Sequence, residues 1–179
     1  MNHYKKYRQS LNKALDSVNW NIVDQVKDVI RQEGHLVTAG NGGSAAICEH
    51  LCCDMSKGTY KKGFQPIHVE SLTANSALLT AIANDFGYEK TFVSQLPAIR
   101  APLGLFISAS GNSKNIIGAA EYCKSNGTIV VGFTGFDGGH LRKLSDYSIH
   151  VRSNNYGIVE DCHQIIMHMI SQKIKAERK

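Results

Sequence analysis

The sequence lacks the cysteine spacing of a disulfide framework or of a thiol metal site. Its five cysteines are an odd number, and none of them forms a CxxC pair. This excludes a thioredoxin-type redox motif and a zinc knuckle, and reduced thiols in a cytosolic protein are the expected state. Cys48, Cys52 and Cys53 share one helical segment without an evident His or Asn partner. We therefore expect these cysteines to be small packing residues and not nucleophiles.

Long apolar runs and dense runs of positive charge are also missing. The N-terminus, MNHYKKYRQSLNKALDSVNW, is polar without an apolar signal core, and no run approaches membrane-spanning length. We therefore expect a soluble, cytoplasmic protein that has no membrane partner. The net charge is +5, and its basic residues are mostly dispersed along the chain. Such a surface suits an anionic small molecule and argues against a nucleic-acid partner, which usually requires a denser basic stripe.

The fingerprints of nucleotide-binding proteins are absent as well. The glycine-rich stretch GNGGSA carries Ala45 where the dinucleotide pattern G-x-G-x-x-G requires its last glycine. The P-loop pattern G-x-x-x-x-G-K-[ST] does not occur. We therefore expect no nucleotide cofactor.

What the sequence does contain is a regular alternation of strand and helix patterns. Short apolar runs predict five strands, at 35–40, 65–71, 103–110, 128–135 and 146–151. Apolar residues at helical spacing predict helices at 4–33, 44–56, 75–86, 87–99, 112–127 and 158–177. Gly34 is expected to end the first helix, and Pro97 to end the helical piece 87–99.

This alternation predicts parallel strands joined by crossover helices on both faces of the sheet. The expected fold class is α/β: a three-layer, five-stranded parallel sheet of flavodoxin-like order, preceded by an N-terminal helix. A length of 179 residues fits one domain. We expect that domain to span 1–179, with a helical segment at 1–34 and the α/β core at 35–179.

Two glycine-serine turns follow strands directly and lead into helices. They are GNGGSA, after the strand at 35–40, and SASGNS, after the strand that begins at residue 103. Glycines let a ligand approach the backbone closely, and a helix N-terminus carries partial positive charge. Tight turns and N-caps alone would explain either turn. Two such turns at equivalent strand ends favour binding of a phosphate or a sugar.

Two helices carry histidines together with carboxylates. His50 and Asp54 lie four residues apart, so both project from one helix face. They either hold a metal or share a proton, or they form an ordinary surface ion pair. Glu160 and His168 are eight residues apart, which is about 12 Å of helix rise, so reaching a single atom would demand long reaches or two subunits. His163 and Asp161 are nearby competitors.

At this point the residues resemble a known family. GNGGSA-x4-H-x3-D, AIANDFG, SASGNS, TGFDGG and the final E-x7-H together resemble the sugar-isomerase (SIS) domain family, and more closely its bacterial phosphoheptose isomerases. The resemblance spans about residues 5 to 172. It implies interconversion of sedoheptulose 7-phosphate and glycero-manno-heptose 7-phosphate, for lipopolysaccharide or capsule. It also implies a homotetramer whose active sites are shared between subunits.

The resemblance also implies a role for each matching position. Substrate binding is implied for Asn41, Gly42, Gly43, Ser44, Asp54, Asn84, Asp85, Ser108, Ala109, Ser110, Ser113 and Glu160. One zinc ion, or another divalent metal, is implied in each site, with the ligands His50, Asp54, Glu160 and His168. The implied catalytic residues are Asp54, Glu160 and His168.

The chain departs from the family pattern at two of these positions. Asp54 replaces the usual Glu and is one methylene shorter, and Glu160 replaces the usual Gln and adds a negative charge. Isomerisation through an enediol needs a base for a carbon proton and an acid that moves a proton between two oxygens. We assign the first role to Asp54 or Glu160 and the second to His168. The alternatives are an isomerase of another ketose phosphate and a non-catalytic phosphosugar sensor or protein-binding adaptor.

Overall fold

A parallel five-stranded sheet forms the centre of the protein. The structure, a computed structural model, describes residues 2–179. The strands are β1 (His35–Gly40), β2 (His68–Ser71), β3 (Leu103–Ser108), β4 (Ile129–Thr134) and β5 (Tyr147–His150). All pairings are parallel and the order is β2-β1-β3-β4-β5. The predicted fold class and the flavodoxin-like order are confirmed.

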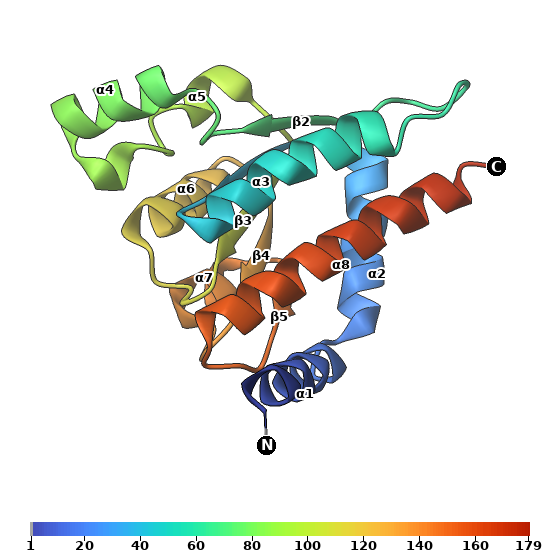
Figure 1. The fold of residues 1–179 in the computed structure, drawn as a ribbon. Coiled ribbons are helices and arrows are strands. Elements are labelled where there is room, and N and C mark those ends of the chain that lie inside the picture. Colours follow the sequence, from blue (N-terminus) through green and yellow to red (C-terminus); the bar gives the residue numbers. More distant parts are fainter. Residues whose placement is uncertain (1) are drawn as a thin grey trace.

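Helices cover both faces of this sheet (Figure 1). One face carries α2 (Trp20–Glu33), α3 (Gly43–Cys53) and α8 (Tyr156–Glu177), with α1 (His3–Asp16) against α8. The other face carries α6 (Lys114–Ser125), α7 (Gly139–Leu144) and the short α5 (Leu96–Ile99), with α4 (Ser76–Phe86) at its margin. The three-layer arrangement therefore agrees with the prediction.

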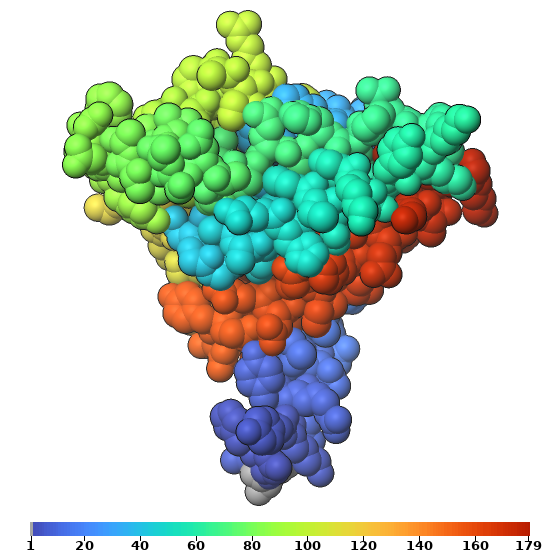
Figure 2. Space-filling model, turned by 45° about the horizontal axis from the view of Figure 1, so that its top comes forward, coloured from blue at the N-terminus to red at the C-terminus, as the bar shows by residue number. Residues whose placement is uncertain are grey.

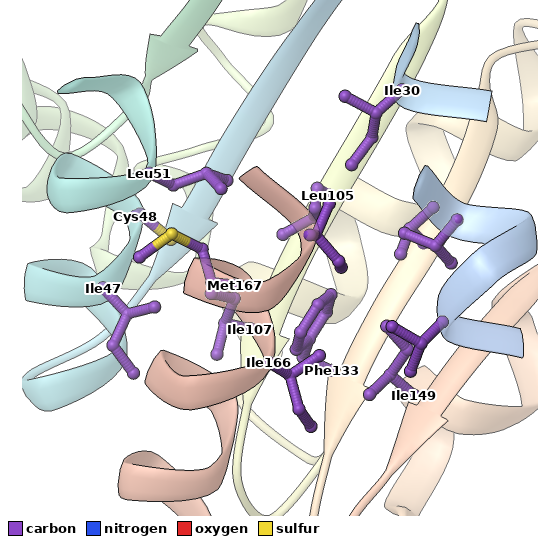
Figure 3. Packing of buried hydrophobic residues seen from close by; sticks show 14 of the residues in the cluster. Ile30, Ile47, Cys48, Leu51, Leu105, Ile107, Phe133, Ile149, Ile166 and Met167 are labelled. Carbon is purple, nitrogen blue, oxygen red and sulfur yellow. The ribbon is translucent and has the colours of Figure 1, made fainter. Parts of the chain in front are cut away.

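Each face of the sheet builds its own hydrophobic core. Side chains alternate along a strand, so Leu36 joins one buried cluster and its neighbour Val37 joins the other. In the first cluster, residues of α2, α3 and α8 meet residues of β3, β4 and β5 (Figure 3). Because strands β1 and β3 are packed on both sides, the loops at their ends start from fixed positions.

The N-terminal segment differs from the prediction of one helix over 4–33. It forms α1 and α2, which are separated at residues 17–19. The Ser17 hydroxyl donates to the carbonyl of Ala14 at 2.6 Å, and the Asn19 side chain accepts from the Asn21 N–H at 3.1 Å. These local hydrogen bonds compete with the helix ladder, so they end one helix and begin the next. Gly34 ends α2 in the left-handed conformation, as expected.

The segment 87–99 also differs from the prediction. It contains a 3₁₀ turn at Tyr88–Lys90 and then the four-residue α5, with Pro97 in the first turn of α5. Proline is well placed there because the first turn of a helix has no use for its missing N–H. Pro97 therefore begins a helix and does not end one. The short helix α7 was not predicted. Within residues 2–179, no helix is long and apolar enough to cross a membrane.

Candidate functional site

The two glycine-serine loops meet where the strand order reverses. β1 and β3 are neighbours in the sheet, but their connections lead away in opposite directions, to β2 and to β4. Ligands of open α/β sheets bind at such a switch point, beyond the carboxyl ends of the strands. The loop after β1 leads into α3 and the loop after β3 leads into α6, so two helix N-termini face the same region.

The first loop is held by side-chain amides. Gly42 has φ of +54°, a left-handed conformation that favours glycine. Asn41 and Asn115 exchange two hydrogen bonds, at 2.9 and 3.0 Å, and the Tyr88 hydroxyl donates to Asn41 Oδ1 at 2.7 Å. These contacts leave Asn41 one further amide hydrogen for a ligand. Neither Asn115 nor Tyr88 was predicted, because no spacing rule connects positions that distant in sequence.

The second loop presents hydroxyls and a tight turn. Ser108 Oγ accepts from the Gly111 N–H at 3.2 Å and lies 3.2 Å from Ser113 Oγ. Gly111 has φ of +67°, and a Cβ there would clash with the Gly138 carbonyl. Ser113 is the N-cap of α6, yet its side chain makes no capping hydrogen bond. Its hydroxyl, whose contact here is with Ser108 Oγ, is therefore placed to bind an anion at the helix N-terminus.

A cavity of about 170 Å³ lies between the two loops. Its lining includes six of the eight predicted loop residues, Asn41, Ser44, Ser108, Ala109, Ser110 and Ser113, together with Ile107, Tyr156 and Glu160. Larger hollows occur elsewhere on the surface, including one beside Pro97 and Arg100, but they lack this set of hydroxyls beside two helix N-termini. The chemistry of the lining, and not its size, identifies the cavity as the candidate sugar-phosphate site.

Glu160 stands against the start of α3. A Cβ built on Gly43 would clash with the Glu160 carboxylate, so a side chain at this position would push the carboxylate away from its present place. Within the described residues, this carboxylate forms no hydrogen bond or ion pair within normal contact distance. Partial burial and, to a lesser extent, Asp161 raise the pKa of Glu160. A carboxylate with a raised pKa that lines a cavity is a candidate general base.

A second group of predicted residues forms a compact cluster beside the other end of α3. His50 Nε2 lies 3.5 Å from Asp54 Oδ1, and His168 Nε2 lies 3.6 Å from Asp54 Oδ2. The two imidazole Nε2 atoms are 3.3 Å apart. Two nitrogen lone pairs at that distance repel each other unless a proton or a cation lies between them. The three side chains therefore form a single centre and not a simple surface ion pair.

The cluster fits a divalent metal ion. One ligand atom from each of its three residues lies within 4.8 Å of the others. Zinc bonds of 2.0–2.2 Å in a tetrahedron place ligand atoms about 3.3 Å apart, close to the separations seen here. Two imidazoles and a carboxylate are also a common donor set for zinc. Glu160, the fourth expected ligand, is not part of this group among the described residues.

The helices α3 and α8 lie side by side and connect the cavity to the cluster (Figure 1 and Figure 2). Glu160 contacts Gly43, the first residue of α3. His168 lies two turns later on α8 and contacts His50 and Asp54, at the C-terminal end of α3. A single straight helix therefore carries both residues, each at its own end of a shared surface. Within one chain, Glu160 and His168 do not have to reach the same atom, so the helix rise of about 12 Å between them is no obstacle.

Two supporting residues were missed by the sequence interpretation. Gln164 Nε2 lies 2.9 Å from His168 Nε2, and Ser171 Oγ lies 3.4 Å from Asp54 Oδ2. The spacing of four from Glu160 to Gln164 and on to His168 places all three on one face of α8, which is a signal that was present in the sequence. Asp54 also begins a π-helical turn, Asp54–Gly58, a feature that often marks functional sites.

Other candidate residues lie outside this surface. Asn84 and Asp85 are exposed at the end of α4, where the Asn84 amide donates to Asp85 Oδ1 at 2.9 Å. The structure does not bring them to the cavity lining of the same chain. Asp161 instead accepts a hydrogen bond from Tyr7 of α1 at 2.7 Å. The carboxylate raises the pKa of the Tyr7 hydroxyl to about 12.

The cysteines behave largely as packing residues. Cys48, Cys123 and Cys162 are buried, Cys52 is half-buried and Cys53 is exposed, and all five are free thiols. Burial raises the pKa of Cys48 and Cys123 to about 12, and that of Cys52 and Cys162 to about 11. These four thiols are therefore not activated nucleophiles.

His163 is a buried core residue, so it is not a competitor of His168. Its Nε2 lies 3.2 Å from the Thr134 carbonyl, which can only accept, so Nε2 carries the proton. Nδ1 is buried without a hydrogen-bond partner. Burial lowers the pKa of His163 from 6.5 to about 4.

This histidine gives a prediction for acid stability. His163 becomes protonated below about pH 6.5 in the unfolded chain, but only below about pH 4 in the folded chain. Stability therefore falls as the pH falls through this window, by about 2 kcal/mol between pH 7 and pH 5. His163→Gln can keep the hydrogen-bond donor to Thr134 but does not titrate. Between pH 7 and pH 5 the variant should therefore lose about 2 kcal/mol less unfolding free energy than the parent, as measured by urea unfolding. Equal pH dependence of both proteins would contradict the assignment.

Comparison with known proteins identifies relatives of the chain. The SIS-domain family model matches residues 3–135. A probable phosphoheptose isomerase of Thermoplasma acidophilum is 34% identical over 177 residues, covering 95% of this chain and 96% of that protein. A phosphoheptose isomerase of Aneurinibacillus thermoaerophilus is 40% identical over 147 residues, covering 80% of this chain and 73% of that protein.

Solved structures share the fold. The structure of a phosphoheptose isomerase from Francisella tularensis superimposes with a TM-score of 0.87 at 23% identity, covering 97% of this chain and 95% of that one. The likeness therefore extends over the helical N-terminal segment as well as the sheet. From the family match and the curated relatives, we conclude that the chain belongs to the SIS-domain family.

Proposed function

We propose that the protein is an aldose–ketose isomerase that interconverts sedoheptulose 7-phosphate and glycero-manno-heptose 7-phosphate through an enediol. The observation that carries this proposal is the surface between α3 and α8, which joins a hydroxyl-lined cavity to a His–Asp–His cluster. The names of the relatives, phosphoheptose isomerases, support the choice of reaction and substrate.

The phosphate end of the substrate belongs in the second loop. Ser110 and Ser113 offer hydroxyls there, the N-terminus of α6 offers partial positive charge, and Asn41 offers an amide hydrogen. The phosphate does not react, so its binding energy can orient the sugar towards the cluster. Gly42 and Gly43 let the sugar approach the backbone of the first loop.

The chemistry requires a base and a proton shuttle. We assign the carbon proton to Glu160, because this carboxylate is unpaired, has a raised pKa and lines the cavity. His168 moves the proton between the two oxygens through the ring nitrogen that does not hold a metal, and Gln164 Nε2 lies 2.9 Å from its Nε2. Because C1, C2 and their oxygens are neighbouring atoms, this division of roles requires the Glu160 carboxylate to move from Gly43 towards His168 when the sugar binds. Asp54 contacts both imidazoles, which favours a positioning and metal-binding role.

Three residues would hold the metal in this scheme. His50, Asp54 and His168 supply the ligands, and a bound divalent ion would polarise the carbonyl oxygen of the sugar. We infer zinc as that ion from the donor set. Glu160 as a further ligand would require the carboxylate to move from its contact with Gly43 towards His168.

We also infer a homotetramer with shared active sites. Asn84 and Asp85 remain proposed substrate contacts, and α4 projects from the body of the chain, where a second copy could receive it (Figure 1). Light scattering should then give a mass four times that of the chain. The corresponding biological role is to supply heptose, in the cytoplasm, for lipopolysaccharide or capsule.

The phosphate loop gives a prediction for binding. Ser113→Ala removes one hydroxyl from a charged ligand, which costs about 1.5–3 kcal/mol and raises KM by about 10–100-fold. The kcat should change little, because the phosphate is bound equally in the ground and transition states. Ser125→Ala, at the exposed far end of the same helix, is the matched control. An unchanged KM in Ser113→Ala would remove this residue from the site.

The proposed reaction is tested by turnover on a panel of ketose phosphates. Sedoheptulose 7-phosphate, fructose 6-phosphate and ribulose 5-phosphate should be compared, with metal content measured on the same samples. We expect the highest kcat/KM with sedoheptulose 7-phosphate. Preference for a shorter sugar would reassign the substrate, and tight binding without conversion of any sugar would instead indicate a phosphosugar sensor.

A further inference from the structure

A second cluster of metal-ligating side chains lies at the opposite end of the sheet. His35 is the first residue of β1, and His68 and Glu70 belong to β2, the edge strand next to it. One ligand atom from each of the three lies within 4.8 Å of the others. Five residue steps along β1 separate His35 from Gly40, which is about 16 Å. The cluster is therefore separate from the cavity at the carboxyl ends of the strands.

The sheet itself fixes the positions of these three residues. His35 and His68 are directly paired in the parallel register of β1 and β2, so their side chains leave the same face. Glu70 follows His68 by two residues and thus shares that face. The two imidazole centroids are 4.9 Å apart. No flexible loop has to fold over to assemble the group.

The side chains converge on one point. His35 Nε2 and His68 Nε2 each lie 3.1 Å from the same oxygen, Glu70 Oε1. The His68 side chain is 64% exposed, so water alone could satisfy its ring nitrogen, yet the ring turns that nitrogen towards the carboxylate. Ligand atoms of a tetrahedral zinc site are about 3.3 Å apart, which matches this spacing.

We propose that His35, His68 and Glu70 bind a second divalent transition-metal ion, of which zinc is the best match. Two neutral imidazoles and a carboxylate supply three ligands, and the exposed side of the cluster leaves a fourth position for water. The ion links edge strand β2 to β1 at the end where that pairing begins. It acts as a structural clamp on the edge of the sheet and takes no part in the isomerase chemistry.

Zinc stoichiometry separates this site from the His50–Asp54–His168 cluster. We expect the full chain to bind two zinc ions per subunit in equilibrium dialysis. The double variant His35→Gln/His68→Gln should bind one, His50→Gln/His168→Gln should bind one, and the combination of all four should bind none. His3→Gln, at an exposed histidine outside both clusters, is the matched control and should still bind two.

A milder variant keeps the test valid if the double histidine variant unfolds. Glu70→Gln retains both imidazoles and the shape of the side chain. Loss even of an outer partner of a ligand costs 10–100-fold in metal affinity, so loss of this direct ligand should weaken zinc binding in the His50→Gln/His168→Gln background by at least about tenfold. In that same background, zinc should raise the Tm of the parent more than that of Glu70→Gln.

Two results would overturn the proposal. One is the absence of zinc binding by a folded His50→Gln/His168→Gln protein. The other is an unchanged zinc stoichiometry in His35→Gln/His68→Gln. Neither result bears on isomerase turnover, so the proposed function and the second metal site fail or stand separately.

Discussion

Glu160→Gln should lower kcat for sedoheptulose 7-phosphate by about 10²–10⁴-fold, the usual contribution of a general base, while zinc content and Tm stay near those of the parent. Gln has the same shape but cannot take a proton at neutral pH. Among the described residues the Glu160 carboxylate forms no hydrogen bond or ion pair, and Gln keeps its shape beside Gly43, so the substitution breaks no polar contact of the fold. The loss should therefore appear in turnover and not in stability.

The reason for choosing Glu160 over Asp54 is their surroundings. Glu160 lines the cavity, and its pKa is raised chiefly by burial, which moves it towards the working pH of the enzyme. Asp54 lies between two imidazoles at 3.5 and 3.6 Å and is occupied in holding the cluster together. We therefore propose that the base in this protein is Glu160, whereas the family resemblance would assign that role to the carboxylate at position 54.

A neighbouring carboxylate provides the control. Asp161→Asn makes the same change of charge one residue away, where the side chain accepts a hydrogen bond from Tyr7 and faces α1. We expect its kcat to stay within a few-fold of the parent. If Glu160→Gln keeps full turnover while Asp54→Asn loses it, the base is Asp54 and the present division of roles is wrong.

Asp54→Asn and His168→Gln should each lose turnover and bound metal together, which is the second large effect. Asn removes the charge that faces both imidazoles, and Gln removes the ring nitrogen that lies 3.3 Å from His50 Nε2. Loss of a direct ligand should weaken zinc binding by at least about tenfold, and kcat/KM should fall by at least about 10²-fold.

Excess zinc distinguishes these variants from Glu160→Gln. Added metal should restore part of the activity of Asp54→Asn, because its defect includes affinity for the ion. It should restore none of the activity of Glu160→Gln, because that protein already holds the metal and lacks the base. His3→Gln controls for the loss of an exposed histidine. Full turnover in both Asp54→Asn and His168→Gln would show that the cluster is not the catalytic centre.

The sequence predicted the sheet and its loops because local patterns determine them. Short apolar runs such as LVTA and LGLFIS favour strands buried on both faces, and each is followed directly by a glycine-serine turn. The His50–Asp54 pair was also predictable, since a spacing of four places both on one helix face. The break between α1 and α2 was harder to predict, because apolar residues keep their helical spacing on both sides of Ser17 and Asn19.

The assembly of the site depended on packing that spacing does not encode. Glu160 and His168 reach opposite ends of α3 because α8 runs alongside α3 (Figure 1), with the Glu160 carboxylate against Gly43. Asn115 and Tyr88 fix Asn41 from positions far along the chain. Asn84 and Asp85 are the opposite case. The sequence motif predicts that they bind the substrate, but they do not line the cavity of the same chain.

The central claim is that Glu160 removes a carbon proton from a ketose phosphate to form an enediol. It is tested most directly by converting sedoheptulose 7-phosphate in D₂O and locating deuterium in the aldose product by NMR. A proton removed from C1 of the ketose and exchanged on the carboxylate should leave deuterium at C2 of the aldose, and Glu160→Gln should form both product and label about 10²–10⁴-fold more slowly. Formation of labelled product by Glu160→Gln at the rate of the parent would contradict the account.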